Sequence, residues 1–206
     1  PTKLNFYSSD SNKICDLDLS IFNSKKFRYT TLKRSALIEY LKNNLFTNNL
    51  RFGKEVKKIS KIKEKLLINF KDNTNDLVDF IIVSDGIFSN TKSVVENKNI
   101  QPIYNGSIAI RSVLKSIPEF DFDKNNISLI MLKNAHIVIY PINKKGDLNL
   151  VCIVRQKFSN NIDLKTVIKN QILTQNTKLE NLFENNLKYW PIFKSKKPSK
   201  SIFENL

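Results

Sequence analysis

Four strand-like segments follow one another in the second half of the sequence, and they constrain the fold more than any other feature. They span 102–114, 126–132, 134–142 and 147–156, and each is rich in β-branched and other apolar residues between turn residues. No helical pattern intervenes before Asp163, so successive strands are expected to pair antiparallel. The sequence therefore predicts a mostly antiparallel sheet here.

Helical and strand patterns alternate in the rest of the chain. Residues 31–46 place leucines at helical spacing, and a second helical pattern starts at Asp163 and is followed by another through Asn186. Residues 55–62 and 64–72 read as two strands joined by a tight turn. This combination predicts a mixed α/β fold.

The run LVDFIIVS, residues 77–84, is β-branched without alternation, which suits a strand buried on both faces. It ends at Asp85-Gly86, and Gly86 is one of only four glycines in the chain. In open α/β folds ligands bind beyond the carboxyl ends of the strands. Glycine permits close approach of a ligand, and the carboxylate accepts hydrogen bonds from hydroxyl groups. An ordinary strand-to-turn transition also explains Asp-Gly, so both interpretations stay open.

The only histidine, His136, precedes Tyr140 by four positions in the segment 134–142. On a strand, His136, Val138 and Tyr140 share one face. An imidazole and a phenol on one face suit a pocket for an aromatic substrate, with the histidine as a base for a phenol proton. The alternative is a half-exposed histidine and an edge tyrosine before Pro141.

The charge of the chain does not favour a nucleic-acid partner, although the formal net charge is +15. Nearly all of this charge comes from scattered lysines, whereas recognition of phosphates and bases favours clustered arginines. Arg34 lies early in the predicted helix, where a cation opposes the helix dipole, so it either meets an anion or lies in solvent.

The histidine and cysteine content predicts that the chain binds no metal, because it has a single histidine and two distant cysteines, Cys15 and Cys152. Two unpaired thiols also suit a protein of the reducing cytoplasm. No apolar run approaches the roughly 18 residues of a membrane span.

Taken in order, these segments resemble the middle of a class A flavin-dependent aromatic-ring hydroxylase, the family of p-hydroxybenzoate, salicylate and 3-hydroxybenzoate hydroxylases. The similar segments are LKRSALIEYL, LRFGKEVKKI, VDFIIVSDGIFSNTK, YNGSIAIRSV, HIVIYPINKKGDLNLVCIV and YWPIF. They cover most of the chain. The resemblance implies part of an FAD-binding Rossmann-like domain over 1–100, whose N-terminal part lies near the substrate domain. It also implies a mostly antiparallel β-sheet substrate domain with following helices over 101–186, and a return toward the FAD-binding domain over 187–206.

The resemblance further implies FAD as the cofactor and NAD(P)H as the co-substrate of a monooxygenase. Arg34 and Val56 would lie along the FAD, and Asp85 and Gly86 would lie near its pyrophosphate and ribityl chain. O₂ would add at the flavin C4a, and the resulting hydroperoxide would transfer oxygen to a small aromatic substrate.

For the substrate, the resemblance implies that His136 and Tyr140 face the ring. His136 would assist deprotonation of its phenol, Tyr140 would position it, and Arg111 on the adjoining strand is a weaker candidate contact.

This sequence departs from the family pattern in four places. Val83 replaces the first glycine of the Asp-Gly motif, and Lys92 stands where arginine is usual. The Gly-x-Gly-x-x-Gly and Gly-Asp motifs that hold FAD would precede Pro1 and follow Leu206. We therefore expect a piece of a longer protein, which alone neither holds flavin tightly nor turns over.

Two alternatives stay open. The first is a flavin hydroxylase of the ubiquinone-biosynthesis type, which acts on a prenylated ring. The second is a basic module that binds RNA or an anionic membrane surface. Within the hydroxylase interpretation, the ring that is hydroxylated, the choice between NADH and NADPH, and assembly as a homodimer are also open.

Overall fold

The computed structural model describes residues 1–24, 26–45, 50–115, 122–183 and 186–195. The chain divides into two compact units, one formed by 1–43 with 106–192 and the other by 44–105 with 193–206. The N-terminal segment therefore groups with the second half of the sequence. The expected assignment of 1–100 to an FAD-binding domain and of 101–186 to a substrate domain stays a prediction. Each unit is described by itself.

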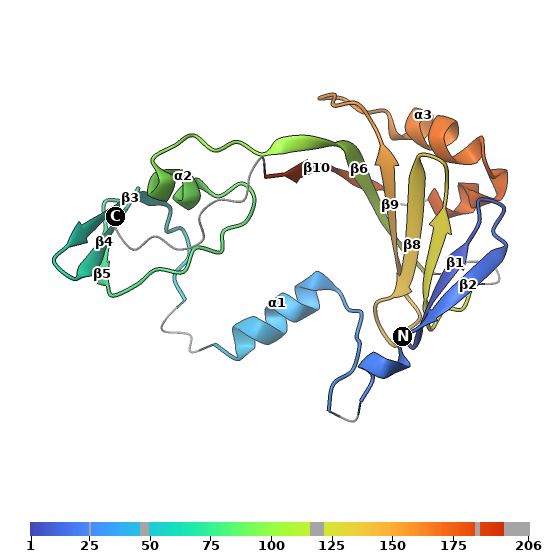
Figure 1. Ribbon diagram of the computed structural model, residues 1–206, viewed down its shortest axis with the longest axis horizontal. Helices are drawn as coiled ribbons and strands as arrows, with labels where there is room; N and C mark the ends of the chain where they lie inside the picture. The colour runs from blue at the N-terminus through green and yellow to red at the C-terminus, as the bar shows by residue number, and fades with distance from the viewer. Residues whose placement is uncertain (25, 46–49, 116–121, 184–185, 196–206) are drawn as a thin grey trace. The chain divides into compact units, whose positions relative to one another are not determined.

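The first unit is built on a seven-stranded sheet with the order β10-β6-β9-β8-β7-β1-β2 (Figure 1). Its strands are β1 (Lys3–Tyr7), β2 (Lys13–Asp18), β6 (Ile103–Leu114), β7 (Ile127–Met131), β8 (Ala135–Pro141), β9 (Leu148–Arg155) and β10 (Lys188–Lys194).

The four strands predicted between residues 102 and 156 are confirmed as β6 to β9. β6 pairs with β9, β9 with β8, and β8 with β7, all antiparallel. The N-terminal hairpin β1–β2 and the strand β10 were not predicted. β1 pairs parallel with β7, so the sheet as a whole is mixed.

One face of this sheet forms the core of the unit. Ile110 of β6, Leu150 of β9 and Ile137 of β8 are fully buried there. Buried side chains also come from three helical segments on one side of the sheet in Figure 1: α3 (Leu164–Ile168), the π-helical turn η3 (Lys169–Leu173) and the 3₁₀ helix η4 (Thr177–Phe183). They fall within the predicted helical region, and Asp163 caps α3 as expected, accepting from Lys165 N at 3.0 Å.

A 3₁₀ turn η1 (Ser20–Phe22) and the helix α1 (Arg34–Asn43) complete the first unit. α1 lies within the predicted helix 31–46. Every residue of α1 is exposed. The hydroxyl of Thr31 donates to the carbonyl of Pro141 and fixes the segment before α1 to the end of β8. In the part of the chain that the structure describes, no helix is both long and apolar enough to cross a membrane.

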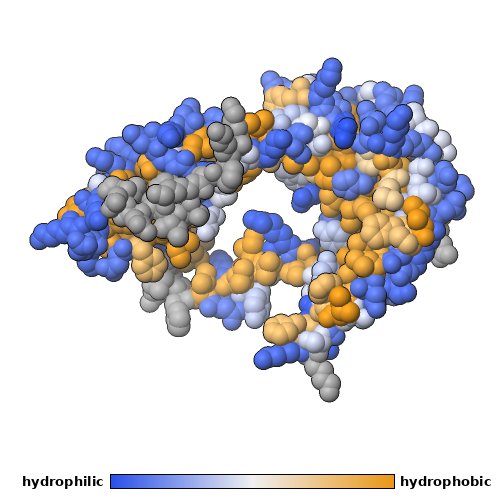
Figure 2. All heavy atoms as spheres, in the orientation of Figure 1, coloured by the Kyte–Doolittle hydropathy of each residue, from blue (hydrophilic) through white to orange (hydrophobic). Residues whose placement is uncertain are grey.

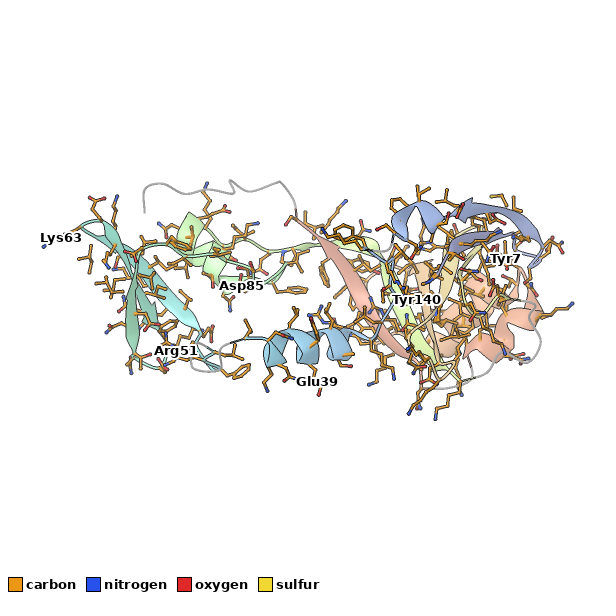
Figure 3. All side chains as sticks on the ribbon, turned by 90° about the horizontal axis from the view of Figure 1, so that it is seen from below. Tyr7, Glu39, Arg51, Lys63, Asp85 and Tyr140 are labelled. Atoms are coloured by element: carbon orange, nitrogen blue, oxygen red, sulfur yellow. The ribbon has the colours of Figure 1, made fainter. Side chains whose placement is uncertain are left out.

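The second unit contains a three-stranded antiparallel sheet, β3 (Val56–Ile62), β4 (Lys65–Phe70) and β5 (Asn75–Val78), and the helix α2 (Asn90–Glu96). The predicted tight turn between β3 and β4 is confirmed. Lys63 adopts a φ of 56° in this turn and lies at the tip of the hairpin in Figure 3. Over 50–105 the only buried hydrophobic side chain is that of Phe70.

The prediction of an interior strand over residues 77–84 was wrong. β5 ends at Val78, pairs only with β4, and forms an edge of its sheet. Phe80 and Ile82 beyond it are 74% and 79% exposed. A strand requires a hydrogen-bonding neighbour, and none of the described segments pairs with residues 79–84, so β propensity alone does not produce one.

Candidate functional site

The three residues predicted to contact substrate lie on the sheet face opposite the core of the first unit. In β8, Ala135, Ile137 and Ile139 are buried, so His136 and Tyr140 project to the other face with Val138 between them. The predicted sharing of one face is confirmed. Figure 3 shows Tyr140 on this sheet, and Figure 2 shows hydrophobic residues gathered over the strands of this unit.

The strand register places Arg111 in line with Val138. Arg111 of β6 is directly opposite Val151 of β9, and Val151 is directly opposite Val138 of β8. Because neighbouring strands lie 4.7–4.9 Å apart, β6 and β8 are separated by roughly 10 Å. The two valines therefore form an apolar floor between the strand of Arg111 and the strand of His136 and Tyr140.

The rows on either side of this floor carry the other polar groups. His136 is directly opposite Ile153, and Tyr140 is directly opposite Asn149. Asn149 is half-buried on the same face. A planar ring lying on Val138 and Val151 would have the imidazole of His136 at one corner. The phenol of Tyr140 and the carboxamide of Asn149 would lie at another corner.

Arg111 contacts an aromatic ring rather than an acid. Its guanidinium carbon lies 5.5 Å from the centroid of the Trp190 ring in β10, within the range of a cation–π interaction. No ion pair joins Arg111 to a carboxylate within the described ranges. The side chains of His136 and Tyr140 likewise make no hydrogen bond to another described residue. All three polar groups are therefore available to a ligand.

Sequence reasoning missed Asn149 and Trp190 as members of this face. Asn149 was noted only as part of a family pattern, yet alternation along β9 places it beside Val151 on the uncovered face. Trp190 belongs to a strand that was not predicted, so no local pattern brought it to Arg111.

The predicted flavin contact Arg34 is the first residue of α1. Its side chain is exposed and pairs with no carboxylate among the described residues. The ammonium nitrogen of the neighbouring Lys33 lies 3.9 Å from a carboxylate oxygen of Asp147. The charge of Lys33 is therefore partly balanced by an acid, whereas that of Arg34 is not. An uncompensated guanidinium suits a phosphate group.

Asp85 and Gly86 form the turn that starts α2 in the second unit. Gly86 adopts a φ of +86°, which favours glycine, and its carbonyl accepts from Ser89 N at 3.1 Å. The Ser89 hydroxyl caps α2, accepting from Lys92 N at 2.9 Å. Partial burial opposes ionisation of Asp85, but interactions with the hydroxyls of Ser89 and Thr91 outweigh it and hold its pKa below the usual value. The carboxylate is therefore ionised at neutral pH.

Val56, the remaining predicted flavin contact, opens β3 opposite Phe70. It is half-buried and supplies only apolar surface. The roles expected for these residues along a flavin stay predictions.

A polar cavity of about 390 Å³ lies elsewhere in the first unit. It is lined by Asp10 and residues 173–178. Two of its side chains already have structural partners: Gln175 accepts from Lys133 N at 2.8 Å, and Asn176 donates to Ser9 O at 2.8 Å. None of the predicted site residues lines this cavity.

No protein-family model and no curated protein matches the sequence, but solved structures match the fold over most of the chain. A variant of HpxO from Klebsiella pneumoniae complexed with FAD gives a TM-score of 0.82 at 13% identity, covering 97% of this chain and 54% of that one. HpxO from the same organism complexed with FAD and uric acid gives 0.76 at 13% identity, covering 93% and 51%. A salicylate hydroxylase substrate complex gives 0.73 at 14% identity, covering 92% and 52%.

The chain thus spans about half the length of the solved structures that it matches. The fold expected from the sequence resemblance is confirmed: the chain has the fold of FAD-dependent aromatic hydroxylases.

Proposed function

We propose that this chain is part of an FAD-dependent monooxygenase that hydroxylates an aromatic substrate at the expense of NAD(P)H and O₂. The observation that carries the proposal is the convergence of Arg111, His136 and Tyr140 on one apolar sheet face around Val138 and Val151. The fold shared with FAD-dependent hydroxylases supports it.

In this proposal the apolar floor binds the ring and excludes water from one side of it. His136 accepts the proton of a phenol on the substrate, which raises the electron density of the ring toward an electrophilic oxygen. Tyr140 orients the ring through its hydroxyl, and Arg111 contacts a substituent. The protein contributes position, desolvation and proton transfer.

FAD is the proposed cofactor. When bound and reduced by NAD(P)H, it supplies the activated oxygen. Arg34 would hold the phosphates, Asp85 and Gly86 would bond the ribityl hydroxyls, and Val56 would contact the cofactor with its apolar side chain. In this assignment the first unit serves mainly the substrate, and the second serves mainly FAD.

The complete gene product, purified with FAD, tests the proposal. We expect hydroxybenzoates to stimulate NAD(P)H oxidation and to yield a hydroxylated product, and His136→Ala to oxidise NAD(P)H with little product. The matched control Lys133→Ala, in the turn before β8, should behave as the unsubstituted protein. Unchanged coupling in His136→Ala would remove the histidine from the mechanism, and no product with any phenolic acid would overturn the proposed activity.

A second candidate substrate is a ring with a prenyl chain. The apolar row continues from Val138 to Leu129 of β7 and Phe6 of β1. With β9 included, it crosses four strands, roughly 14 Å from first to last, which would accommodate several isoprene units. Turnover of a prenylated phenol in preference to a hydroxybenzoate would establish this alternative.

A further inference from the structure

Three large apolar side chains are exposed on the loop that joins β2 to α1. Ile21, Phe22 and Phe27 are 78%, 55% and 69% exposed, and they fall within seven positions of the sequence. Single exposed apolar residues are common on protein surfaces, whereas a group of them marks a surface that meets a partner or a membrane. In Figure 1 this loop is the blue segment below the N-terminus.

The backbone of this loop is held in place by the side chain of Asn23. The Asn23 amide nitrogen donates to Leu19 O at 2.9 Å and to Pro1 O at 3.3 Å, and its side-chain oxygen accepts from Tyr29 N at 3.1 Å. Leu19 is buried, and its N–H donates to Thr2 O at 2.7 Å, which fixes the start of the loop beside β1. The apolar side chains are therefore exposed on a backbone of defined conformation.

The charge of the loop is exclusively positive. Lys26 and Arg28 flank Phe27, and both are exposed and pair with no carboxylate in the described part of the chain. No acidic residue occurs over residues 19–38, whereas five lysines and arginines do. Exposed cations beside exposed apolar side chains complement the negative surface and the apolar interior of a bilayer.

This composition favours a lipid surface over a protein or a nucleic acid. Lysine is depleted at protein–protein interfaces. Single-stranded RNA offers bases on which a ring can stack, but it offers no apolar environment to an aliphatic side chain such as Ile21. A bilayer accepts both kinds of side chain, because the apolar ones enter the boundary between headgroups and acyl chains while the cations stay among the phosphates.

We propose that the loop of residues 19–31 binds the surface of a bilayer that contains anionic lipids. Ile21, Phe22 and Phe27 enter the boundary between headgroups and acyl chains, and Lys26 and Arg28 contact the lipid phosphates. The contact is peripheral and does not cross the bilayer. It is independent of the proposed monooxygenase activity, since none of these five residues belongs to the substrate face or to the predicted flavin contacts.

Vesicle binding by the complete gene product, purified with FAD, tests the proposal. The probes are vesicles of phosphatidylcholine alone and vesicles in which about one third of the lipid is phosphatidylglycerol. Co-sedimentation measures the affinity. We expect the anionic vesicles to bind about tenfold or more tightly than the neutral ones. The difference should shrink several-fold in about 0.5 M salt, because salt screens the charge of the lipid surface.

Substitutions in the loop separate the apolar contribution from the electrostatic one. Phe27→Ser should weaken binding to the anionic vesicles about tenfold, since its ring no longer leaves water. The double variant Lys26→Gln, Arg28→Gln should weaken it about twentyfold, because each cation near an anionic surface contributes a factor of about five. All three side chains are exposed, so thermal unfolding of these variants should be unchanged.

Matched controls remove the same kinds of side chain elsewhere in the first unit. Phe158→Ser removes a phenylalanine that is 57% exposed. The double variant Lys133→Gln, Lys157→Gln removes two exposed cations, one before β8 and one after β9. The loop is attached at the other end of β8, where Thr31 donates to the carbonyl of Pro141. These controls should bind both kinds of vesicle as the unsubstituted protein does.

A tryptophan probe locates the ring of position 27 in the bilayer. Brominated lipids should quench the fluorescence of Phe27→Trp more than that of the unsubstituted protein, and Phe158→Trp should show no such increase. Equal binding to the two kinds of vesicle, equal losses in the loop variants and their controls, or no added quenching at position 27 would overturn the inference.

Two further outcomes distinguish this inference from its alternatives. Loop-dependent binding to polyuridylate without binding to either kind of vesicle would assign the loop to RNA and overturn the inference. Loop-dependent binding to anionic vesicles without hydroxylation of any substrate would support the inference and overturn the proposed monooxygenase activity.

Discussion

The side-chain oxygen of Asn126 accepts a hydrogen bond from the backbone N–H of Thr2 at 2.7 Å, across 124 positions of sequence. The same oxygen accepts from Lys3 N at 2.8 Å, and the Asn126 amide nitrogen donates to Asp123 at 2.6 Å. Asn126 is buried. One carboxamide therefore fixes the start of β1 to the start of β7, where the parallel pairing of the sheet begins.

We expect Asn126→Ala to lower the free energy of unfolding by about 1–3 kcal/mol, because two backbone donors lose their acceptor. Denaturant unfolding measures this loss, and hydrogen exchange should show faster exchange in β1 than in β8. Asn125→Ala is the control, since the Asn125 side chain lies in the same turn and makes no hydrogen bond to another described residue. Equal losses in the two variants would contradict the assignment.

The two faces of β8 should respond differently to truncation. Ile137→Ala removes a fully buried side chain and should cost about 2–4 kcal/mol of unfolding free energy. Val138→Ala acts on the uncovered face, so it should change stability by less than about 1 kcal/mol while weakening hydroxybenzoate binding roughly three- to tenfold. Thermal unfolding and calorimetry on both variants separate the effects. A Val138 variant with unchanged affinity would show that the ring does not lie on this floor.

Loss of the Ser89 cap of α2 should raise the pKa of Asp85. Ser89→Ala removes the acceptor for Lys92 N and one of the groups that lower the Asp85 pKa, so this pKa should rise toward its ordinary value. A carboxyl whose pKa is depressed by folding stabilises the fold above its unfolded pKa, and that contribution is lost as pH falls through the folded pKa. The Ser89 variant should therefore lose less stability on acidification. NMR titration of the carboxyl carbon checks the shift, and Ser84→Ala should leave it unchanged.

The two thiols should react at very different rates. Cys15 is exposed and Cys152 is buried, and burial raises the pKa of the Cys152 thiol to about 12. At pH 8, iodoacetamide should therefore modify Cys15 alone in the native protein and both cysteines after denaturation. Peptide mass spectrometry identifies the modified residue. Rapid labelling of Cys152 in the native Cys15→Ser variant would show that the sheet opens readily there.

The sequence predicted those parts of the fold that depend on near neighbours. β6 to β9 are antiparallel, each has its own apolar pattern, and turn residues separate them, so local information was sufficient. β1 pairs with a strand more than a hundred residues away, and β10 borders β6 from the far end of the chain. Their own residues carry no signal of those partners. The prediction of a strand over residues 77–84 was wrong because the composition of this segment suits a strand, whereas a strand forms only where another segment pairs with it.

The candidate site was predictable to the same extent. Alternation along β8 placed His136 and Tyr140 on one face, and the register then added Arg111. The contact between Arg111 and Trp190 depends on how β10 lies beside β6, which no periodicity encodes. The proposed roles of Arg34, Val56, Asp85 and Gly86 stay predictions, since they come from family resemblance.

The exposed run after β5 also bears on how the protein behaves at high concentration. Residues 80–84, FIIVS, contain no charge and no proline, and Phe80, Ile82 and Val83 are all exposed. Such a segment can add to the same segment of another copy, backbone to backbone, and grow into insoluble assemblies. We therefore expect these five residues to promote aggregation of the protein at high concentration, and Ile82→Lys should keep more of it in solution.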